Sequence, residues 1–154
     1  MAERIAAALA ARGIDAEARP IDEVAEVGGY DAVVLGSGIY VGRWLSEARR
    51  FAEDNAATLT TMPVWLFSSG PLGGSEGAEP ADGATLAELT GAREHRVFAG
   101  RLDRTRLGPA ERLIVRFVRA PEGDERDWAA VDRFAADIGA ALERHERLAL
   151  HAGR

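Results

Sequence analysis

Two stretches of the sequence decide the fold: Asp31-Ala-Val-Val-Leu-Gly-Ser-Gly-Ile-Tyr-Val-Gly42 and Pro63-Val-Trp-Leu-Phe-Ser-Ser-Gly-Pro-Leu-Gly-Gly74. Each begins with a continuous apolar run, which then gives way to glycine and serine. Such runs are typical of strands in a parallel sheet, because those strands are buried on both faces. We therefore predict buried strands at Ala32–Leu35 and Pro63–Phe67, followed by loops at Ser37–Gly42 and Ser68–Pro80.

The rest of the chain alternates between helix and strand patterns. Apolar residues at helical spacing predict helices at Met1–Arg12, Arg43–Ala57, Ala84–Thr90, Leu107–Arg119 and from Asp127, as the cap, to about Arg147. Further elements are predicted as strands at Ile14–Pro20 and Arg96–Ala99 and as a helical turn at Asp22–Val27. This alternation means an α/β fold with a parallel sheet covered by helices on both faces. Ligands of such sheets bind beyond the carboxyl ends of the strands, where both glycine-rich loops lie.

Composition limits the classes of function. The 154 residues suit a single domain spanning 1–154, with 47% hydrophobic residues for a core. A net charge of −6 argues against nucleic-acid binding. The absence of cysteine excludes disulfides, thiolate metal sites and a cysteine nucleophile, and it fits a cytoplasmic protein. No apolar run approaches the roughly 18–20 residues that cross a bilayer.

The two loops have the residue types that a flat ring system needs. Gly38 and Gly42 allow the backbone to approach a ligand closely, and Tyr40 and Trp44 offer flat apolar faces. Hydroxyls and amides of the second loop suit the polar edge of a heterocycle. Two interpretations remain open from the residues alone: a ring-binding slot, or ordinary turns with aromatic residues packed on the core.

Tyr30–Gly73 resembles the flavodoxin-like domains of the menaquinone-dependent protoporphyrinogen dehydrogenase group. Phe98-Ala-Gly-Arg-Leu, the apolar helix Glu111–Val118, Gly123-Asp124 and Asp127-Trp128 resemble the C-terminal half of that group. The resemblance implies a flavodoxin-like three-layer sandwich that binds FMN. It places the isoalloxazine near Ser37, Gly38, Ile39, Tyr40 and Gly42, and its pyrimidine edge near Ser68, Ser69, Gly70, Pro71, Leu72 and Gly73.

The same resemblance implies an FMN-dependent oxidoreductase of heme biosynthesis. Such an enzyme takes electrons from a tetrapyrrole substrate, protoporphyrinogen, and passes them to a quinone. The flavin performs the redox chemistry, so no catalytic side chain is predicted. Two alternatives stay open: a flavodoxin-type electron carrier without its own substrate, and a flavin-free remnant with a structural or interaction role.

The N-terminal part of the sequence departs from the family pattern. Flavodoxin-like domains begin with an apolar strand and a hydroxyl-rich loop whose groups, with the next helix N-terminus, hold the FMN phosphate. This chain has no Ser or Thr before Ser37, and Met1–Arg12 matches the helix that follows that loop. We therefore expect the first, central strand and the phosphate site to be absent. The chain is then N-terminally truncated relative to the family. The expected cause is an internal methionine taken as the start, and the alternative is a genuinely shortened protein.

The predicted helix Leu107–Arg119 is basic on one face. Arg112, Arg116 and Arg119 share that face, and apolar residues share the other. A basic amphipathic helix is typical of peripheral contact with an anionic membrane, here the inner face of the membrane that holds menaquinone. The alternative is that the apolar face packs on its own domain.

The remaining chemistry-bearing residues have no site pattern. His95, His145 and His151 lack metal-ligand spacing, so we predict no metal site and expect these histidines to be exposed. The acidic residues Glu79 and Asp82 are expected in a solvated loop.

Overall fold

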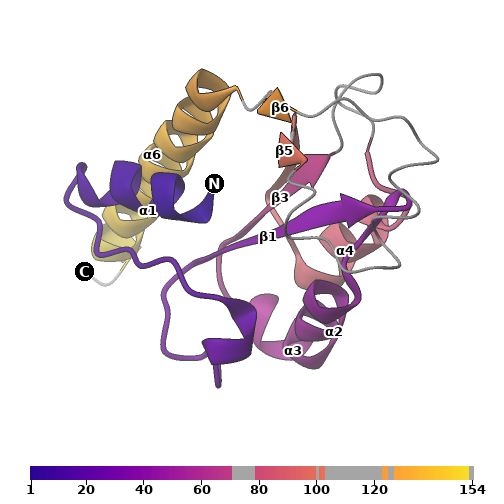
Figure 1. Ribbon diagram of the computed structural model, residues 1–154. Coiled ribbons are helices and arrows are strands. Elements are labelled where there is room, and N and C mark those ends of the chain that lie inside the picture. The colour runs from indigo at the N-terminus through magenta and orange to yellow at the C-terminus, as the bar shows by residue number, and fades with distance from the viewer. Residues whose placement is uncertain (71–78, 100, 103–122, 125–126, 153–154) are drawn as a thin grey trace. The chain divides into compact units, whose positions relative to one another are not determined.

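The computed structural model describes residues 1–70, 79–99, 101–102, 123–124 and 127–152 (Figure 1). They belong to two compact units. One unit combines Met1–Glu23 with Asp127–Arg154, and the other is Val24–Arg126. The predicted α/β class with a parallel sheet is confirmed in the second unit.

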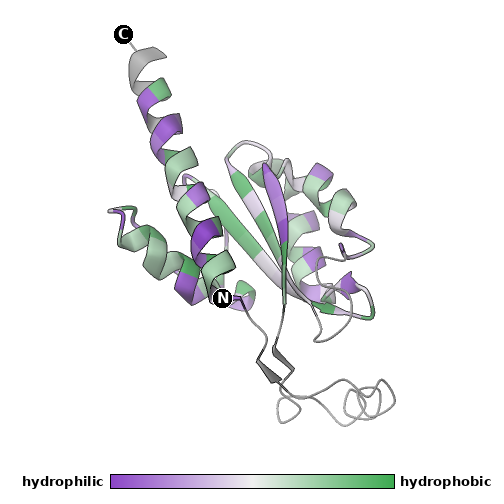
Figure 2. Ribbon diagram, turned by 90° about the horizontal axis from the view of Figure 1, so that it is seen from above, coloured by the Kyte–Doolittle hydropathy of each residue, from purple (hydrophilic) through white to green (hydrophobic). Residues whose placement is uncertain are grey.

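The sheet has four strands in the order β2-β1-β3-β4. Their bounds are β1 Val33–Tyr40, β2 Arg43–Trp44, β3 Val64–Gly70 and β4 Glu94–Ala99. β1, β3 and β4 are parallel, whereas β2 is antiparallel to β1. The core lies along β3, where Val64 and Leu66 are fully buried. Hydrophobic residues along the central strands agree with this burial (Figure 2). A separate two-stranded sheet pairs β5 Arg101–Leu102 with β6 Gly123–Asp124.

Three helices of this unit lie on one face of the sheet (Figures 1 and 2). They are α2 Ser46–Asp54, α3 Ala56–Leu59 and α4 Gly83–Thr90. Their buried residues include Ala52, Leu59 and Leu86, so each helix turns its apolar stripe inward. The predicted helix at Ala84–Thr90 is confirmed.

The other unit pairs α1 Ala2–Ala10 with the long helix α6 Trp128–Ala152 and also holds a 3-10 turn, η1 Ile21–Glu23. Arg4 makes two hydrogen bonds of 2.7 Å to the carboxylate of Asp132, and Arg12 binds Glu143 at 2.7 Å. The order of these ion pairs shows that both helices run in the same direction. The predicted cap of α6 is confirmed, because Ala130 N donates to Asp127 Oδ1 at 2.9 Å.

The predicted strand at Ile14–Pro20 is wrong. Residues 1–32 are described throughout and contain no strand. The alternating pattern of that segment is built from alanines and charged residues, and most of these residues are exposed. A strand needs a neighbour for its backbone N–H and C=O groups, and the described sheet offers this segment none.

The boundary between the first strand and its helix is also corrected. β1 continues through Tyr40 instead of ending at Leu35, and Arg43–Trp44 forms a strand instead of the first helical turn. The helix therefore begins at Ser46. The physical reason is pairing: Ile39 faces Trp44 and Tyr40 faces Arg43 across a hairpin. The second strand likewise runs on to Gly70, and the helical turn predicted at Asp22–Val27 is a 3-10 turn at Ile21–Glu23.

The predicted basic helix Leu107–Arg119 lies outside the described residues. Within the described part of the chain, no helix has the length and apolar character needed to span a bilayer.

Candidate functional site

The two glycine- and serine-containing segments lie side by side at the carboxyl edge of the sheet. Ser37 is the Cα partner of Ser68, and Gly38 is the partner of Ser69. Gly70 in turn pairs with Ala99 of β4. Three strand ends therefore meet where parallel sheets place their ligands.

A tight hairpin turn forms the outer rim of this edge. Val41 and Gly42 connect β1 to β2 with φ values of 49° and 72°. Positive φ at both central residues is the signature of a type I′ turn, which suits a two-residue hairpin. A β-branched residue such as Val41 is strained in this conformation, and residues held in this way cluster at functional sites. The turn is tied to the chain before α4, since Ala81 N donates to Gly42 O at 2.8 Å.

Apolar side chains are concentrated at this rim. Among the described residues, four large hydrophobic side chains are exposed, and Tyr40, Val41 and Leu45 are three of them, at 38%, 77% and 45%. Open space surrounds Gly42, where a Cβ would meet no atom within 4 Å. An exposed apolar group beside accessible backbone is what a flat ligand needs for stacking and hydrogen bonding.

The other predicted contact residues are placed as follows. Ile39 reaches over the tip of β3, because a Cβ at Gly70 would lie 3.5 Å from its Cδ1 atom. Ser69 and Gly70 are half-buried. Pro71, Leu72 and Gly73 lie outside the described residues. As flavin contacts, all of these residues stay predictions.

The Ser37 hydroxyl is used inside the fold. Its Oγ atom accepts a hydrogen bond from Leu45 N at 3.1 Å and donates one to Gly38 O at 2.8 Å. Ser37 thereby joins the end of β1 to the residue that precedes α2. These two bonds hold the backbone of this segment in place, and Ser37 as a flavin contact stays a prediction.

The Ser68 hydroxyl is fully buried and also engaged. Trp44 Nε1 donates to Ser68 Oγ at 2.7 Å, and His95 Nε2 lies 2.7 Å from the same oxygen. The Trp44 and His95 rings meet edge to face, with centroids 6.0 Å apart. One polar chain therefore crosses from β2 through β3 to β4.

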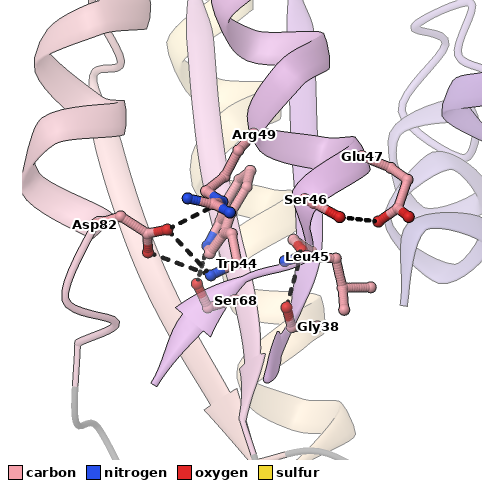
Figure 3. A network of polar contacts seen from close by, with 9 residues as sticks. Gly38, Trp44, Leu45, Ser46, Glu47, Arg49, Ser68 and Asp82 are labelled. Carbon is pink, nitrogen blue, oxygen red and sulfur yellow. Dashed lines mark hydrogen bonds and ion pairs between the residues drawn. The ribbon is translucent and has the colours of Figure 1, made fainter. Parts of the chain in front are cut away.

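Asp82 closes this network from the start of α4. Its carboxylate accepts the backbone N–H of Trp44 at 3.2 and 3.3 Å and lies 3.7 Å from Arg49 Nε (Figure 3). The expectation of a solvated Asp82 is wrong, since only 14% of its side chain is exposed. Glu79 agrees better with the expectation, with 60% of its side chain exposed.

The expectation of an exposed His95 is also wrong. Its side chain is 4% exposed, because β4 begins at Glu94 and carries His95 into the sheet. Burial lowers the pKa of His95 below 6.5, and the carboxylate of Glu79, 3.4 Å from Nδ1, acts in the opposite direction. His95 is therefore neutral at pH 7, whereas His145 is exposed as expected.

The lowered pKa predicts how stability depends on pH. In the unfolded chain the imidazole binds a proton near pH 6.5, and in the folded chain only at lower pH. The contribution of neutral His95 to the free energy of unfolding is therefore complete above pH 6.5, and it is lost as the pH falls toward the pKa of His95 in the folded protein. Urea unfolding at pH 7.5 and 5.5 measures this loss, which His95→Gln should reduce and the exposed control His145→Gln should leave unchanged. Equal pH slopes for His95→Gln and the unsubstituted protein would contradict it.

Sequence reasoning located the two central strands but ended each of them too early, and it missed the polar groups beside their carboxyl ends. The prediction that Trp44 lies in a helix and offers a flat face to a ligand is wrong, because Trp44 is 2% exposed and its indole binds Ser68 in the interior. His95 and Asp82 are likewise expected in solvent and are found in the same network. The start of the third predicted strand was the signal that could have revealed His95. Extending Arg96–Ala99 by two residues toward the N-terminus places His95 in the strand, next to Ser68. In the part of the chain that is described, no group of three or more metal-ligating side chains occurs.

A family model described as a flavodoxin domain matches residues 1–128. No curated protein and no solved structure matches the chain.

Proposed function

The chain belongs to the flavodoxin domain family, and we propose that it binds a flavin ring at the carboxyl edge of the sheet and transfers electrons through it. One observation carries the proposal: the exposed apolar side chains of Tyr40, Val41 and Leu45 gather at the edge where β1 and β3 end together. A flat ring that covers them removes apolar surface from water, which is the main driving force for such binding.

The described residues fit the ring part of a flavin. Tyr40 offers an aromatic face, and the open backbone around Gly42 allows close approach. The half-buried Ser69 and Gly70 supply backbone groups for a polar ring edge. Residues 1–36 do not fit the phosphate group of FMN, because they contain no serine or threonine whose hydroxyl could bind it.

The chain's contribution to electron transfer is positional. A bound flavin supplies the redox chemistry, and the protein sets its orientation and its surroundings. The apolar rim excludes water from one side of the ring site. The hydroxyls of Ser37 and Ser68, already committed inside the fold, hold the strand ends at a fixed spacing.

Flavin titration tests the proposal. We expect quenching of flavin fluorescence on addition of the protein, and about tenfold weaker binding for Tyr40→Ala because a stacking face is lost. Tyr30→Ala is the matched control, since Tyr30 precedes β1 at the opposite end of the strand. FMN and riboflavin should bind within about threefold of each other, because the proposed contacts are to the ring.

Three results would contradict parts of this proposal. Absence of binding by either flavin rejects the function. Equal losses for Tyr40→Ala and Tyr30→Ala reject the location of the site. A preference for FMN above about tenfold would show that the phosphate is held after all.

The finer proposal concerns the electron donor and acceptor. The resemblance around Phe98 and Asp127-Trp128 supports oxidation of a tetrapyrrole precursor with a quinone as acceptor. Turnover of protoporphyrinogen with a menaquinone analogue by the flavin-loaded chain would support this enzyme. Flavin binding without turnover of protoporphyrinogen favours an electron carrier. If the protein does not bind flavin, a structural or interaction role is favoured. Membrane contact through Leu107–Arg119 stays a proposal.

A further inference from the structure

We propose that Trp44, Ser68 and His95 are positioning residues that hold the rim of the ring site in place. This inference rests on the proposed function and deepens it. The residues touch one another in the interior and leave the rim surface to Tyr40 and Val41. Their exposure is low: Trp44 is 2% exposed and Ser68 is fully buried.

One of the two hydrogen bonds at Ser68 has a fixed direction. The indole N–H of Trp44 only donates, so Ser68 Oγ must accept it. The direction of the second bond, between Ser68 Oγ and His95 Nε2 at 2.7 Å, depends on the tautomer of the imidazole. Ser68 Oγ accepts if Nε2 carries the proton and donates if Nδ1 carries it. In both cases the Ser68 hydroxyl links the two rings.

The hydrogen bonds among Trp44, Ser68 and His95 connect strands that are not all neighbours in the sheet. β1 lies between β2 and β3, yet the Trp44 side chain of β2 reaches Ser68 of β3. His95 extends the link to β4 and lies against the first residue of α4, where a Cβ at Gly83 would approach its ring to 2.9 Å. Buried hydrogen bonds are strong and costly to break, so they fix these elements relative to one another.

The rim needs such a support. β2 has only two residues, and a ladder of two residue pairs is weak by itself. The strained φ of Val41 persists only if its surroundings impose it. Trp44 is the Cα partner of Ile39, so a fixed indole fixes the strand end from which Tyr40 projects. Its backbone N–H is held as well, by Asp82.

Ser68→Ala and Trp44→Phe test the proposal, and both keep the core apolar. Trp44→Phe removes the bond between Trp44 and Ser68, whereas Ser68→Ala removes that bond and also the one between Ser68 and His95. We expect each variant to bind riboflavin about tenfold more weakly. The double variant should be no weaker than Ser68→Ala, because Ser68→Ala already breaks the bond that Trp44→Phe removes. Amide hydrogen exchange at Ile39–Arg43 should accelerate about tenfold in the absence of flavin.

Thr90→Val is the matched control. Thr90 is fully buried, and its hydroxyl donates to Leu86 O at 2.7 Å within α4. It therefore loses a comparable buried hydrogen bond away from the rim. We expect its riboflavin affinity and its exchange at Ile39–Arg43 to stay within about twofold of the unsubstituted protein.

The outcomes separate the two proposals. If the unsubstituted protein binds no flavin, the proposed function fails, and with it the role of these residues in a ring site. The hydrogen-exchange rates then decide only whether Trp44, Ser68 and His95 support the rim. If it binds flavin but Ser68→Ala and Trp44→Phe match Thr90→Val in affinity and exchange, the positioning role is overturned. Additive losses in the double variant also overturn it, because they would mean two independent effects.

Discussion

Gly36→Ala is expected to lower the free energy of unfolding by about 2–3 kcal/mol. Gly36 is the Cα partner of Phe67 in the parallel ladder, and a Cβ at Gly36 would fall within the Phe67 ring. The ring has little room to move, because it is 6% exposed and its centroid lies 6.3 Å from that of Phe98. The added methyl group must therefore displace backbone or a packed ring.

Urea unfolding followed by circular dichroism measures this loss. Adding Phe67→Leu to Gly36→Ala should recover part of the stability, because the smaller side chain makes room for the methyl group. Gly29→Ala is the control, since a Cβ at Gly29 meets no atom within 4 Å. A loss for Gly36→Ala no larger than that for Gly29→Ala would mean that the two strands are not paired in this register.

Phe134→Ala is expected to cost about 3–5 kcal/mol. Phe134 lies in α6 and is fully buried, together with Val131 and Ile138 on the same face. Removing the ring forfeits its transfer free energy and leaves a cavity that surrounding side chains fill only in part. The same unfolding experiment measures the effect.

Arg133→Ala is the control on the adjacent position of the helix. The Arg133 side chain is 66% exposed, and its nearest ion-pair partner atom, Asp127 Oδ2, is 3.7 Å away. An exposed pair of this kind contributes about 0–1 kcal/mol. Similar losses for Phe134→Ala and Arg133→Ala would contradict the assignment of Phe134 to the core face.

The helical pattern of α6 was readable in the sequence because its information is local. Val131, Phe134 and Ile138 recur at helical spacing, and Asp127 precedes them as a capping residue. The apolar runs at Ala32–Leu35 and Pro63–Phe67 were equally clear, because few arrangements other than a buried strand accommodate them.

The secondary structure of Trp44 could not be predicted from the neighbouring residues in the sequence. Its spacing to Ala48 and Ala52 fits a helix, and all three residues are buried. The hairpin with Ile39 places Trp44 in a strand instead, and nothing in a helical window records that pairing. Pairing across a turn overrides local propensity when it satisfies backbone groups that the alternative leaves unpaired.

The sequence by itself determined the α/β class, the two central strands and the glycine- and serine-containing segments at their carboxyl ends. It did so because burial imposes a period or a run that is visible along the chain. The tertiary structure alone decided that the Ser68 hydroxyl meets Trp44 and His95, which lie 24 and 27 positions away. Such contacts depend on strand order and register, and once water is excluded each polar group must find its partner within the fold.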